Sequence, residues 1–293
     1  MSENIIANDN ASVNPKLRLF NMLKAGHGAI ATFMTLKGVR AAQVIAHTGV
    51  DVSATISRSA KKIADSLLQA IVIDCEHGHI GDSDMHDMVV AVSGSGVSPI
   101  IRIRGQSGDL IKRALDTGAH GIMVPTVNTS AEARAVISAS KFPPIGVRGQ
   151  GSPFACFEHG LATPSEYVAK ANDSLVMMIQ IETVAGVENV DEICQVDGVE
   201  INTHAKDLLF IGPNDLALSL LGYTPAKFTE TVFLTAIDKV VASAKKHGKK
   251  VGILTVDGET TKKAKERFDM VVLSNDTRSL QAWYGKELKI ARS

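Results

Sequence analysis

Residues 71–78, Ile-Val-Ile-Asp-Cys-Glu-His-Gly, form an apolar run that ends in a cluster of chargeable side chains. The same change occurs in residues 178–182, Met-Ile-Gln-Ile-Glu, and in residues 210–215, Phe-Ile-Gly-Pro-Asn-Asp. Runs that are apolar throughout are typical of parallel strands buried on both faces. Buried charge needs a partner or a cation, so packing alone does not explain the carboxylates that follow these runs. The pattern favours a metal-assisted active site at the ends of parallel strands.

Short apolar, β-branched runs recur along the chain with helical patterns between them. Eight alternating strand and helix units are what a (β/α)₈ TIM barrel needs. The predicted strands are Ala29–Met34, Ala70–Asp74, Pro99–Arg102, Gly121–Val124, Leu175–Ile181, Leu208–Ile211, Lys250–Leu254 and Met270–Leu273. Predicted helices between them include Asp109–Thr117, Ser130–Ser140, Val187–Cys194 and Thr231–His247.

An open doubly wound sheet is the competing fold. It predicts a glycine-rich dinucleotide turn after the first strand. Residues 35–40, Thr-Leu-Lys-Gly-Val-Arg, are not such a turn. We therefore expect a flexible, polar tail over residues 1–14 and a single barrel over residues 15–293. Ser53–Ala70 is predicted to be an additional amphipathic helix, on the surface or at a subunit contact.

The composition indicates a small-molecule enzyme rather than a nucleic-acid or membrane protein. Of the 293 residues 45% are hydrophobic, and Lys+Arg and Asp+Glu both total 31. Balanced charge predicts neither a nucleic-acid nor an anionic membrane partner. Three cysteines without metal-ligand spacing fit a reducing compartment, and no apolar run is long enough to cross a membrane. We expect a cytoplasmic protein.

In a parallel barrel, the carboxyl ends of the strands meet at one mouth, where catalytic groups gather. Every polar cluster noted above follows the end of a predicted strand, whereas the opposite ends carry no comparable cluster. The side chains in question are Asp74, Glu76, His77, Arg102, Gln180, Glu182, Asn214 and Asp215.

Glu182 and Asp215 are the candidate ligands of a hard divalent cation. Ligation by one or two carboxylates, with positions left for water and substrate, suits Mg²⁺ or Mn²⁺. The alternative is that both are solvated loop carboxylates.

His77 and Arg102 each have a catalytic and a structural interpretation. His77 could act as a general base because imidazole titrates near neutrality, or it could be a satisfied loop histidine. Arg102 could clamp a carboxylate or stabilise an oxyanion, or it could form an ion pair with Asp74 or Glu76.

Six motifs in order resemble those of the metal-dependent (class II) pyruvate aldolases, a family that includes macrophomate synthase. The resemblance extends from about Leu19 to Ala291, nearly the whole chain. The motifs are Asp74-Cys-Glu-His-Gly78, Pro99-Ile-Ile-Arg102, Ile111-Lys-Arg-Ala-Leu-Asp116, Pro143-Pro-Ile-Gly-Val-Arg-Gly149, Gln180-Ile-Glu182 and Ile211-Gly-Pro-Asn-Asp-Leu216.

The resemblance implies a barrel aldolase that splits 2-oxo-4-hydroxy acids into pyruvate and an aldehyde, with Mg²⁺, Mn²⁺ or Co²⁺ as its divalent metal. It implies that Glu182 and Asp215 hold the metal, which chelates pyruvate. Arg102 then stabilises the enolate oxygen, and Gln180 lies against the bound keto acid. Asn214 stands where the family commonly has alanine and could reshape the substrate pocket.

The resemblance also implies that His77 pairs with Asp116 and promotes proton transfer through water at the metal. Asp116 is expected near the carboxyl end of a helix, which places it away from the mouth of its own barrel. We therefore expect the pair to form across a subunit boundary of a homo-oligomer, and the resemblance suggests a hexamer. A carboxylate at a helix C-terminus should also have a cationic neighbour.

The sequence leaves other functions open. Oxaloacetate decarboxylation, or a macrophomate-synthase-like reaction, would use the same ligands, and a non-catalytic keto-acid-binding protein is a further alternative. A Schiff-base aldolase needs a desolvated lysine at the mouth, for which only Lys37 is placed. Residues Glu200–Lys206 look like an insertion before the strand that leads to Asp215.

Overall fold

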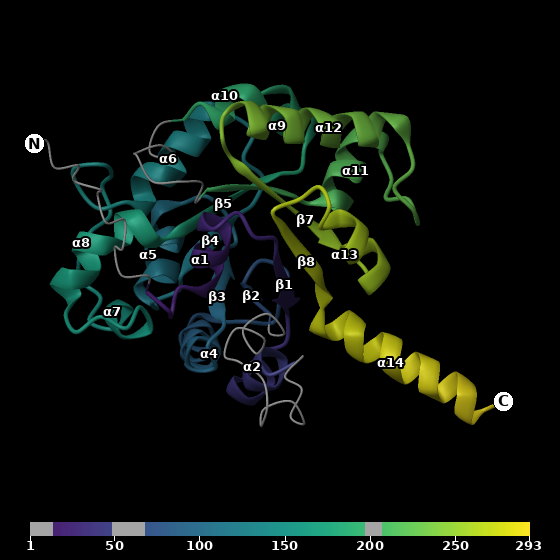
Figure 1. The fold of residues 1–293 in the computed structure, drawn as a ribbon, viewed down its shortest axis with the longest axis horizontal. Coiled ribbons are helices and arrows are strands. Elements are labelled where there is room, and N and C mark those ends of the chain that lie inside the picture. Colours follow the sequence, from purple (N-terminus) through teal and green to yellow (C-terminus); the bar gives the residue numbers. More distant parts are fainter. Residues whose placement is uncertain (1–13, 49–67, 197–206) are drawn as a thin grey trace, which may run out of the picture.

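The computed structural model describes residues 14–48, 68–196 and 207–293. In this part of the chain eight parallel strands close into a barrel in sequence order, with helices around it, as Figure 1 shows. The predicted (β/α)₈ TIM barrel is therefore confirmed. The strands are β1 (Ala29–Met34), β2 (Ala70–Asp74), β3 (Ser98–Arg102), β4 (Gly121–Val124), β5 (Val176–Ile181), β6 (Leu208–Ile211), β7 (Lys250–Thr255) and β8 (Met270–Asn275).

All the helices but α1 follow strands, and several of them begin at residues that the sequence marks as caps. The Thr129 hydroxyl accepts from Glu132 N at 3.2 Å, and Pro213 opens another helix that Gly222 ends with a φ of 78°. The helices are α1 (Arg18–Lys24), α2 (Val39–Ala46), α4 (Asp82–Gly94), α5 (Gly108–Asp116), α6 (Ser130–Ser140), α7 (Ala155–Glu158), α8 (Pro164–Ser174), α9 (Val184–Glu188), α10 (Val190–Cys194), α11 (Pro213–Leu221), α12 (Thr231–Lys246), α13 (Gly258–Ala264) and α14 (Asp276–Ala291).

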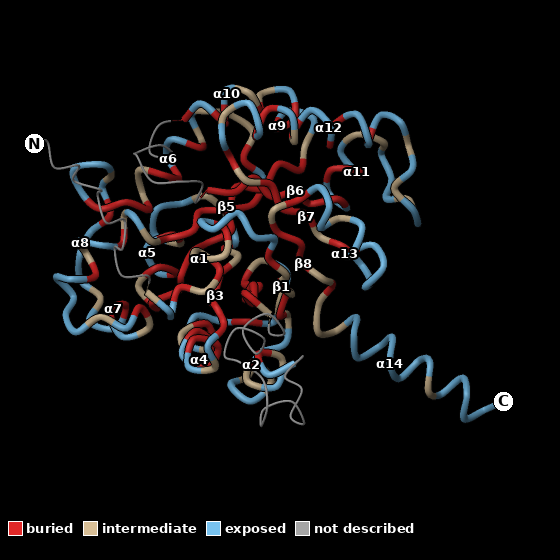
Figure 2. Tube along the Cα trace, in the orientation of Figure 1, coloured by how far each residue is buried: buried red, intermediate tan, exposed pale blue. Residues whose placement is uncertain are grey.

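Strand alternation divides the core into two apolar clusters. Side chains of one parity fill the barrel, among them Val72, Met178 and Phe210, and Leu19 and Leu23 of α1 join this inner cluster. Side chains of the other parity, such as Ile73 and Ile179, pack outward against the helices. Figure 2 shows the strands mostly buried, which explains why their sequences are largely apolar without alternation.

The predicted strand boundaries agree with the structure within two residues. One helix prediction is wrong: residues 187–194 do not form one helix, because α9 and α10 meet at Asn189. The Asn189 amide there donates to Asn128 O at 2.9 Å. Most of Ser53–Ala70 and all of Glu200–Lys206 lie outside the described residues, as does the tail up to residue 13. Ala70 itself begins β2.

Helix α14 is unlike the other long helices. It extends away from the barrel toward the C-terminus, and none of its residues is buried (Figures 1 and 2). Its exposed side chains nonetheless include Leu280, Trp283 and Tyr284. Separately, no helix among residues 14–48, 68–196 and 207–293 combines the length and the apolar character needed to span a membrane.

Candidate active site

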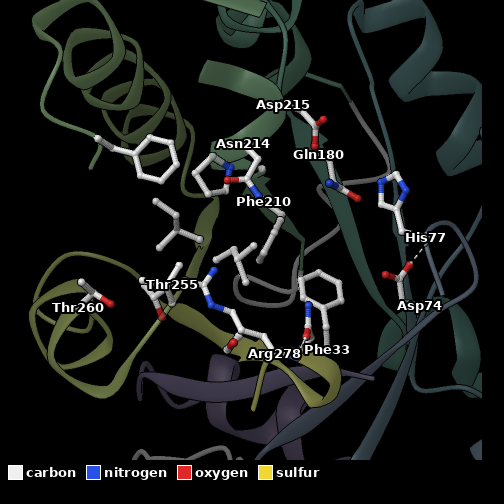
Figure 3. A pocket seen from close by; sticks show the side chains of 18 of the residues that line it. Phe33, Asp74, His77, Gln180, Phe210, Asn214, Asp215, Thr255, Thr260 and Arg278 are labelled. Carbon is white, nitrogen blue, oxygen red and sulfur yellow. Dashed lines mark hydrogen bonds between the residues drawn. The ribbon is translucent and has the colours of Figure 1, made fainter. Parts of the chain in front are cut away.

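A cavity of about 670 Å³ opens at the carboxyl ends of the strands (Figure 3). Its wall includes residues predicted to carry the chemistry, together with aromatic and apolar side chains from β1, β6 and α12. The predicted site residues that line it are Asp74, His77, Arg102, Gln180, Asn214 and Asp215. Strands far apart in the sequence therefore deliver these groups to one place, as a barrel requires.

Asp74 and Arg102 form the first half of the site. They are direct partners in the register of β2 and β3, so their side chains project next to each other. Arg102 Nε donates to Asp74 Oδ1 at 2.9 Å, and Nη2 donates to Oδ2. Arg102 Nε also lies 3.4 Å from Glu76 Oε2, and the guanidinium stands 4.5 Å from the centre of the Phe33 ring. The structural interpretation of Arg102 as an ion-paired residue is thus correct.

The ion pair does not use the whole guanidinium. Among the described residues its contacts engage Nε and Nη2, which leaves Nη1 to donate to a ligand in the cavity. Asp74 Oδ1 also accepts from the backbone N of Glu76 and of His77, both at 3.1 Å. Asp74 therefore holds Arg102 and shapes the turn that presents His77.

His77 is exposed at the cavity, with Nε2 3.7 Å from Glu76 Oε2. Gly78 makes this turn possible, because a Cβ there would lie 2.2 Å from Asp74 O. Burial raises the pKa of Glu76, whereas the charges of Arg102 and His77 lower it and those of Asp74 and Asp215 raise it. The net shift of the Glu76 pKa is upward, so the neighbouring cations do not fully compensate for the burial of this carboxylate.

Glu182 forms the second half of the site. Its Oε1 accepts from Thr126 N at 2.8 Å and from Thr126 Oγ1 at 3.0 Å, and its Oε2 accepts from Gln180 Nε2. Glu182 is 4% exposed and is not among the residues that line the cavity, whereas its close neighbours Gln180 and Gly212 are. Burial raises the pKa of Glu182, the Thr126 backbone hydrogen bond lowers it, and the charges of Asp215 and Glu76 raise it further.

Asp215 and Asn214 lie in the first turn of α11, and both are exposed. Asp215 influences the pKa of both Glu182 and Glu76, so these carboxylates share one electrostatic environment. A divalent cation among them would relieve this repulsion.

The donor set fits a hard divalent cation. Gln180 Oε1 is buried without a hydrogen-bond partner in the described part of the chain, and it belongs to a residue of the cavity wall. No three carboxylate, imidazole or thiol groups within those residues lie close enough to bind a metal by themselves. Two protein carboxylates with substrate and water in the remaining positions match the preference of Mg²⁺ and Mn²⁺.

Asp116 is the predicted catalytic residue that the structure does not bring to the cavity. It ends α5, five residues before β4 begins, so it lies toward the opposite end of the barrel from the mouth. Its Oδ1 accepts from Arg148 Nη2 at 3.1 Å, which confirms the expected cationic neighbour. Arg148 is fully buried and donates through Nη1 to the Tyr167 hydroxyl at 3.0 Å.

Three other groups with potential chemistry, a lysine, a cysteine and a histidine, do not take part in the site. Lys37 Nζ lies 3.7 Å from Asp84 Oδ2, and no lysine is among the described residues that line the cavity. Burial raises the pKa of Cys75 to about 12, so its thiol is not an activated nucleophile. His79 is exposed and outside the cavity wall.

Sequence reasoning did not identify Thr126 or the role of Gly212. Thr126 adopts a φ of 54°, which turns its N–H and hydroxyl together toward Glu182, and nothing in its sequence context predicts this. Gly212 does carry a signal, because a glycine directly after a buried strand often marks a close backbone approach. A Cβ there would lie 2.3 Å from Glu182 Oε2.

The fold and the cavity together define a TIM-barrel enzyme with an acidic, oxygen-rich site at the carboxyl ends of its strands. Residues 48–280 match the family described as HpcH/HpaI aldolase/citrate lyase, and the chain belongs to this family. The resemblance to pyruvate aldolases is therefore confirmed, and the protein is a carbon–carbon lyase of the aldolase type.

Relatives with described activities are similar over most of the chain. A hydroxypyruvate/pyruvate aldolase of Rhizorhabdus wittichii is 34% identical over 88% of this chain and 91% of its own length. A 2-keto-3-deoxy-L-rhamnonate aldolase of Klebsiella pneumoniae is 36% identical over 71% of this chain and 74% of its own. The structure of an HpcH/HpaI aldolase from Desulfitobacterium hafniense superposes with a TM-score of 0.78 at 27% identity, covering 93% of this chain and 96% of that chain.

Proposed function

We propose that the protein is a divalent-metal-dependent aldolase that reversibly cleaves 2-oxo-4-hydroxy acids into pyruvate and an aldehyde. The observation that carries this proposal is the shared environment of Glu182 and Asp215 beside the unpartnered Gln180 Oε1. Glu182 and Asp215 would hold Mg²⁺, Mn²⁺ or Co²⁺. When bound, the cation draws electrons from the 2-oxo acid and so favours loss of the C3–C4 bond.

The protein side chains supply orientation and proton transfer. Arg102, fixed by Asp74 and Glu76, donates through Nη1 to the oxygen on which negative charge develops. Gln180 lies against the keto acid. His77 accepts the proton of the 4-hydroxyl group as the C3–C4 bond breaks and returns a proton to the pyruvate fragment.

Asp116 enters this proposal through a second subunit. It does not reach the cavity of its own chain, while its Oδ2 has no hydrogen bond within the described residues and is free to accept one. We infer a homo-oligomer in which Asp116 of one chain pairs with His77 of another, and the family resemblance suggests a hexamer. The exposed apolar side chains of α14 support an association of this kind. The three free, buried cysteines support a cytoplasmic location.

Metal dependence is tested by assaying a panel of 2-oxo-4-hydroxy acids and oxaloacetate with chelator, followed by Mg²⁺, Mn²⁺ or Co²⁺. We expect chelator to abolish aldehyde release and the metals to restore it. Treatment with borohydride and pyruvate should leave the protein unlabelled, and a trapped pyruvyl-lysine would contradict the metal route. Release of CO₂ from oxaloacetate without any aldehyde-forming cleavage would identify a decarboxylase instead.

The two roles at the site can be separated by paired substitutions. Glu182→Gln should lose metal binding and activity, because an amide cannot replace the anionic oxygen that Thr126 and Gln180 position. His77→Ala should bind Mn²⁺ as the wild type does but turn over about 10²-fold or more slowly, the usual contribution of a general base. Calorimetry with Mn²⁺ and steady-state kinetics measure both effects. Full activity of His77→Ala would show that another group is the base.

A further inference from the structure

One cation in the cavity wall has no role in the chemistry proposed above. Arg278, in the first turn of α14, lines the same cavity as His77 and Asp215. In Figure 3 its guanidinium points into the cavity beside Thr255, across from the Asp74 and His77 side. Its backbone N–H donates to Asn275 Oδ1 at 2.7 Å, so the start of the helix does not depend on the Arg278 side chain.

The Arg278 guanidinium forms no ion pair with any of the described carboxylates. Asp257 is near enough for the Arg278 charge to help lower its pKa, but hydrogen bonds from Thr260 are the larger cause. Asp257 Oδ1 accepts from Thr260 N and from Thr260 Oγ1, both at 2.8 Å. Asp257 thus serves as the cap of α13 and leaves the guanidinium available to a ligand.

The charges of the cavity define what such a ligand would be. Among the described residues of its wall, the only other guanidinium is Arg102, which Asp74 and Glu76 already engage. The 2-oxo acid end of a substrate would lie at the cation that Glu182 and Asp215 would hold, with Arg102 beside its oxo oxygen. A second anionic group on the same substrate would need a cation of its own.

Arg278 is the only cationic donor among the described residues on its side of the cavity wall. The Thr260 hydroxyl is bound to Asp257, and the Thr277 hydroxyl lies 2.7 Å from that of Thr35. The same cavity wall includes the apolar side chains of Phe233 and Leu234 of α12. An extended ligand could therefore place its carbon chain along α12 and its distal end at the guanidinium.

We propose that Arg278 binds a carboxylate or phosphate on the aldehyde half of the substrate and so selects acceptor aldehydes that carry a terminal anion. This inference rests on the proposed aldolase function. A planar guanidinium can donate two parallel hydrogen bonds to either group. Fixing both ends of the substrate orients the C3–C4 bond between them.

The test compares acceptors that differ only in the anion, condensed with pyruvate in the presence of Mg²⁺. Succinic semialdehyde is paired with butanal, and glyceraldehyde 3-phosphate with glyceraldehyde. The wild type should prefer one or both anionic acceptors, and the preferred pair identifies carboxylate or phosphate. Arg278→Leu should lower kcat/KM for the preferred anionic acceptor by about 100-fold, as expected for loss of a charge-assisted bidentate contact.

The neutral acceptors serve as internal references. Arg278→Leu should change kcat/KM for butanal and glyceraldehyde by less than about threefold, and Arg278→Lys should retain part of the preference. Arg134→Leu, an exposed arginine of α6 outside the cavity, is the matched control and should behave as the wild type. An equal loss for charged and neutral acceptors, or a wild type that prefers neither anion, would overturn the assignment.

A binding measurement keeps this inference separate from turnover. With Mg²⁺ and pyruvate present, succinate should bind the wild type at least about tenfold more tightly than it binds Arg278→Leu. Equal succinate affinity would overturn the role of Arg278 whether or not cleavage occurs. Hydrogen exchange at C3 of pyruvate tests the aldolase proposal, because an aldolase forms the pyruvate enolate. If the metal-loaded wild type shows no exchange, the aldolase proposal is refuted, whereas the succinate measurement still decides whether Arg278 binds an anion.

Discussion

The Glu182 carboxylate lies where it does because the chain in front of it carries no side chain. Gly212 joins β6 to α11, and any Cβ at this position would enter the space of Glu182 Oε2. Thr126 fixes the other oxygen from the opposite side. Glu182 is thus held between two backbone segments, which restricts its position to the one that faces Gln180.

Gly212→Ala should therefore weaken the metal site as well as the fold. Displacement of the carboxylate should lower Mn²⁺ affinity at least about tenfold, with a stability loss of about 1–3 kcal/mol from the added methyl group. Calorimetry with Mn²⁺ and thermal unfolding measure the two effects. Gly94→Ala is the matched control, because a Cβ there meets nothing within 4 Å. Unchanged Mn²⁺ affinity in Gly212→Ala would show that Glu182 is not a ligand.

Residue types at the ends of strands are enough to predict part of the polar cavity wall. Asp74, His77, Gln180 and Asp215 all line it, as their positions after apolar runs imply. Their pairings are not predictable, because they depend on strand register. Arg102 shows this: both its interpretations are reasonable from the sequence, and only its position opposite Asp74 decides that it forms an ion pair.

Several elements meet at the opposite end of the barrel, around two buried histidines. The Ser98 hydroxyl accepts from Leu19 N at 3.0 Å and lies 3.1 Å from His120 Nδ1, while His120 Nε2 donates to Glu158 O at 3.0 Å. The His120 and His159 rings are 5.1 Å apart. This cluster joins α1, β3 and the segment around α7.

Protonation of these histidines should destabilise the protein in acid. Burial lowers the pKa of His120 from 6.5 to about 4 and that of His159 from 6.5 to about 3. Between pH 6.5 and these values the unfolded chain binds more protons than the folded one, so stability falls as pH decreases and is fully present above pH 6.5. A tenfold difference in proton affinity between the folded and unfolded chain corresponds to about 1.4 kcal/mol of stability.

His159→Gln should make this acid-dependent loss shallower. Urea unfolding at a series of pH values from about 7 to about 4 measures the slope of stability against pH. His27→Gln, an exposed histidine, is the control and should leave the slope unchanged. The same slope in His159→Gln and wild type would mean that this imidazole does not contribute.

At the scale of the whole molecule, the proposed pairing of Asp116 with His77 requires two subunits. The structure places Asp116 with Arg148 and away from the cavity, as the position at the end of α5 predicts. Arg148 fixes the carboxylate at a part-exposed position, where it can accept a hydrogen bond from another chain.

Mixing two impaired variants tests whether the site is shared. His77→Ala and Asp116→Asn should each turn over about 10²-fold or more slowly than the wild type as homo-oligomers, and unfolding and refolding them together should restore activity. If His77 and Asp116 come from different subunits, random equal mixing should restore about a quarter of the sites, those in which the His77 and the Asp116 that meet are both unsubstituted. Activity of the mixture no greater than the sum of the separate variants would contradict a shared site, as would an active monomer that still requires Asp116.

The sequence by itself determined the barrel, because eight buried strands must be apolar on both faces and this composition is visible without coordinates. It also determined which end of the barrel carries the polar groups. Only the tertiary structure decided that Asp74 binds Arg102, that Gly212 and Thr126 confine Glu182, and that Arg278 shares the cavity. These relations join residues far apart along the chain, and they depend on register and backbone turns that local patterns do not encode.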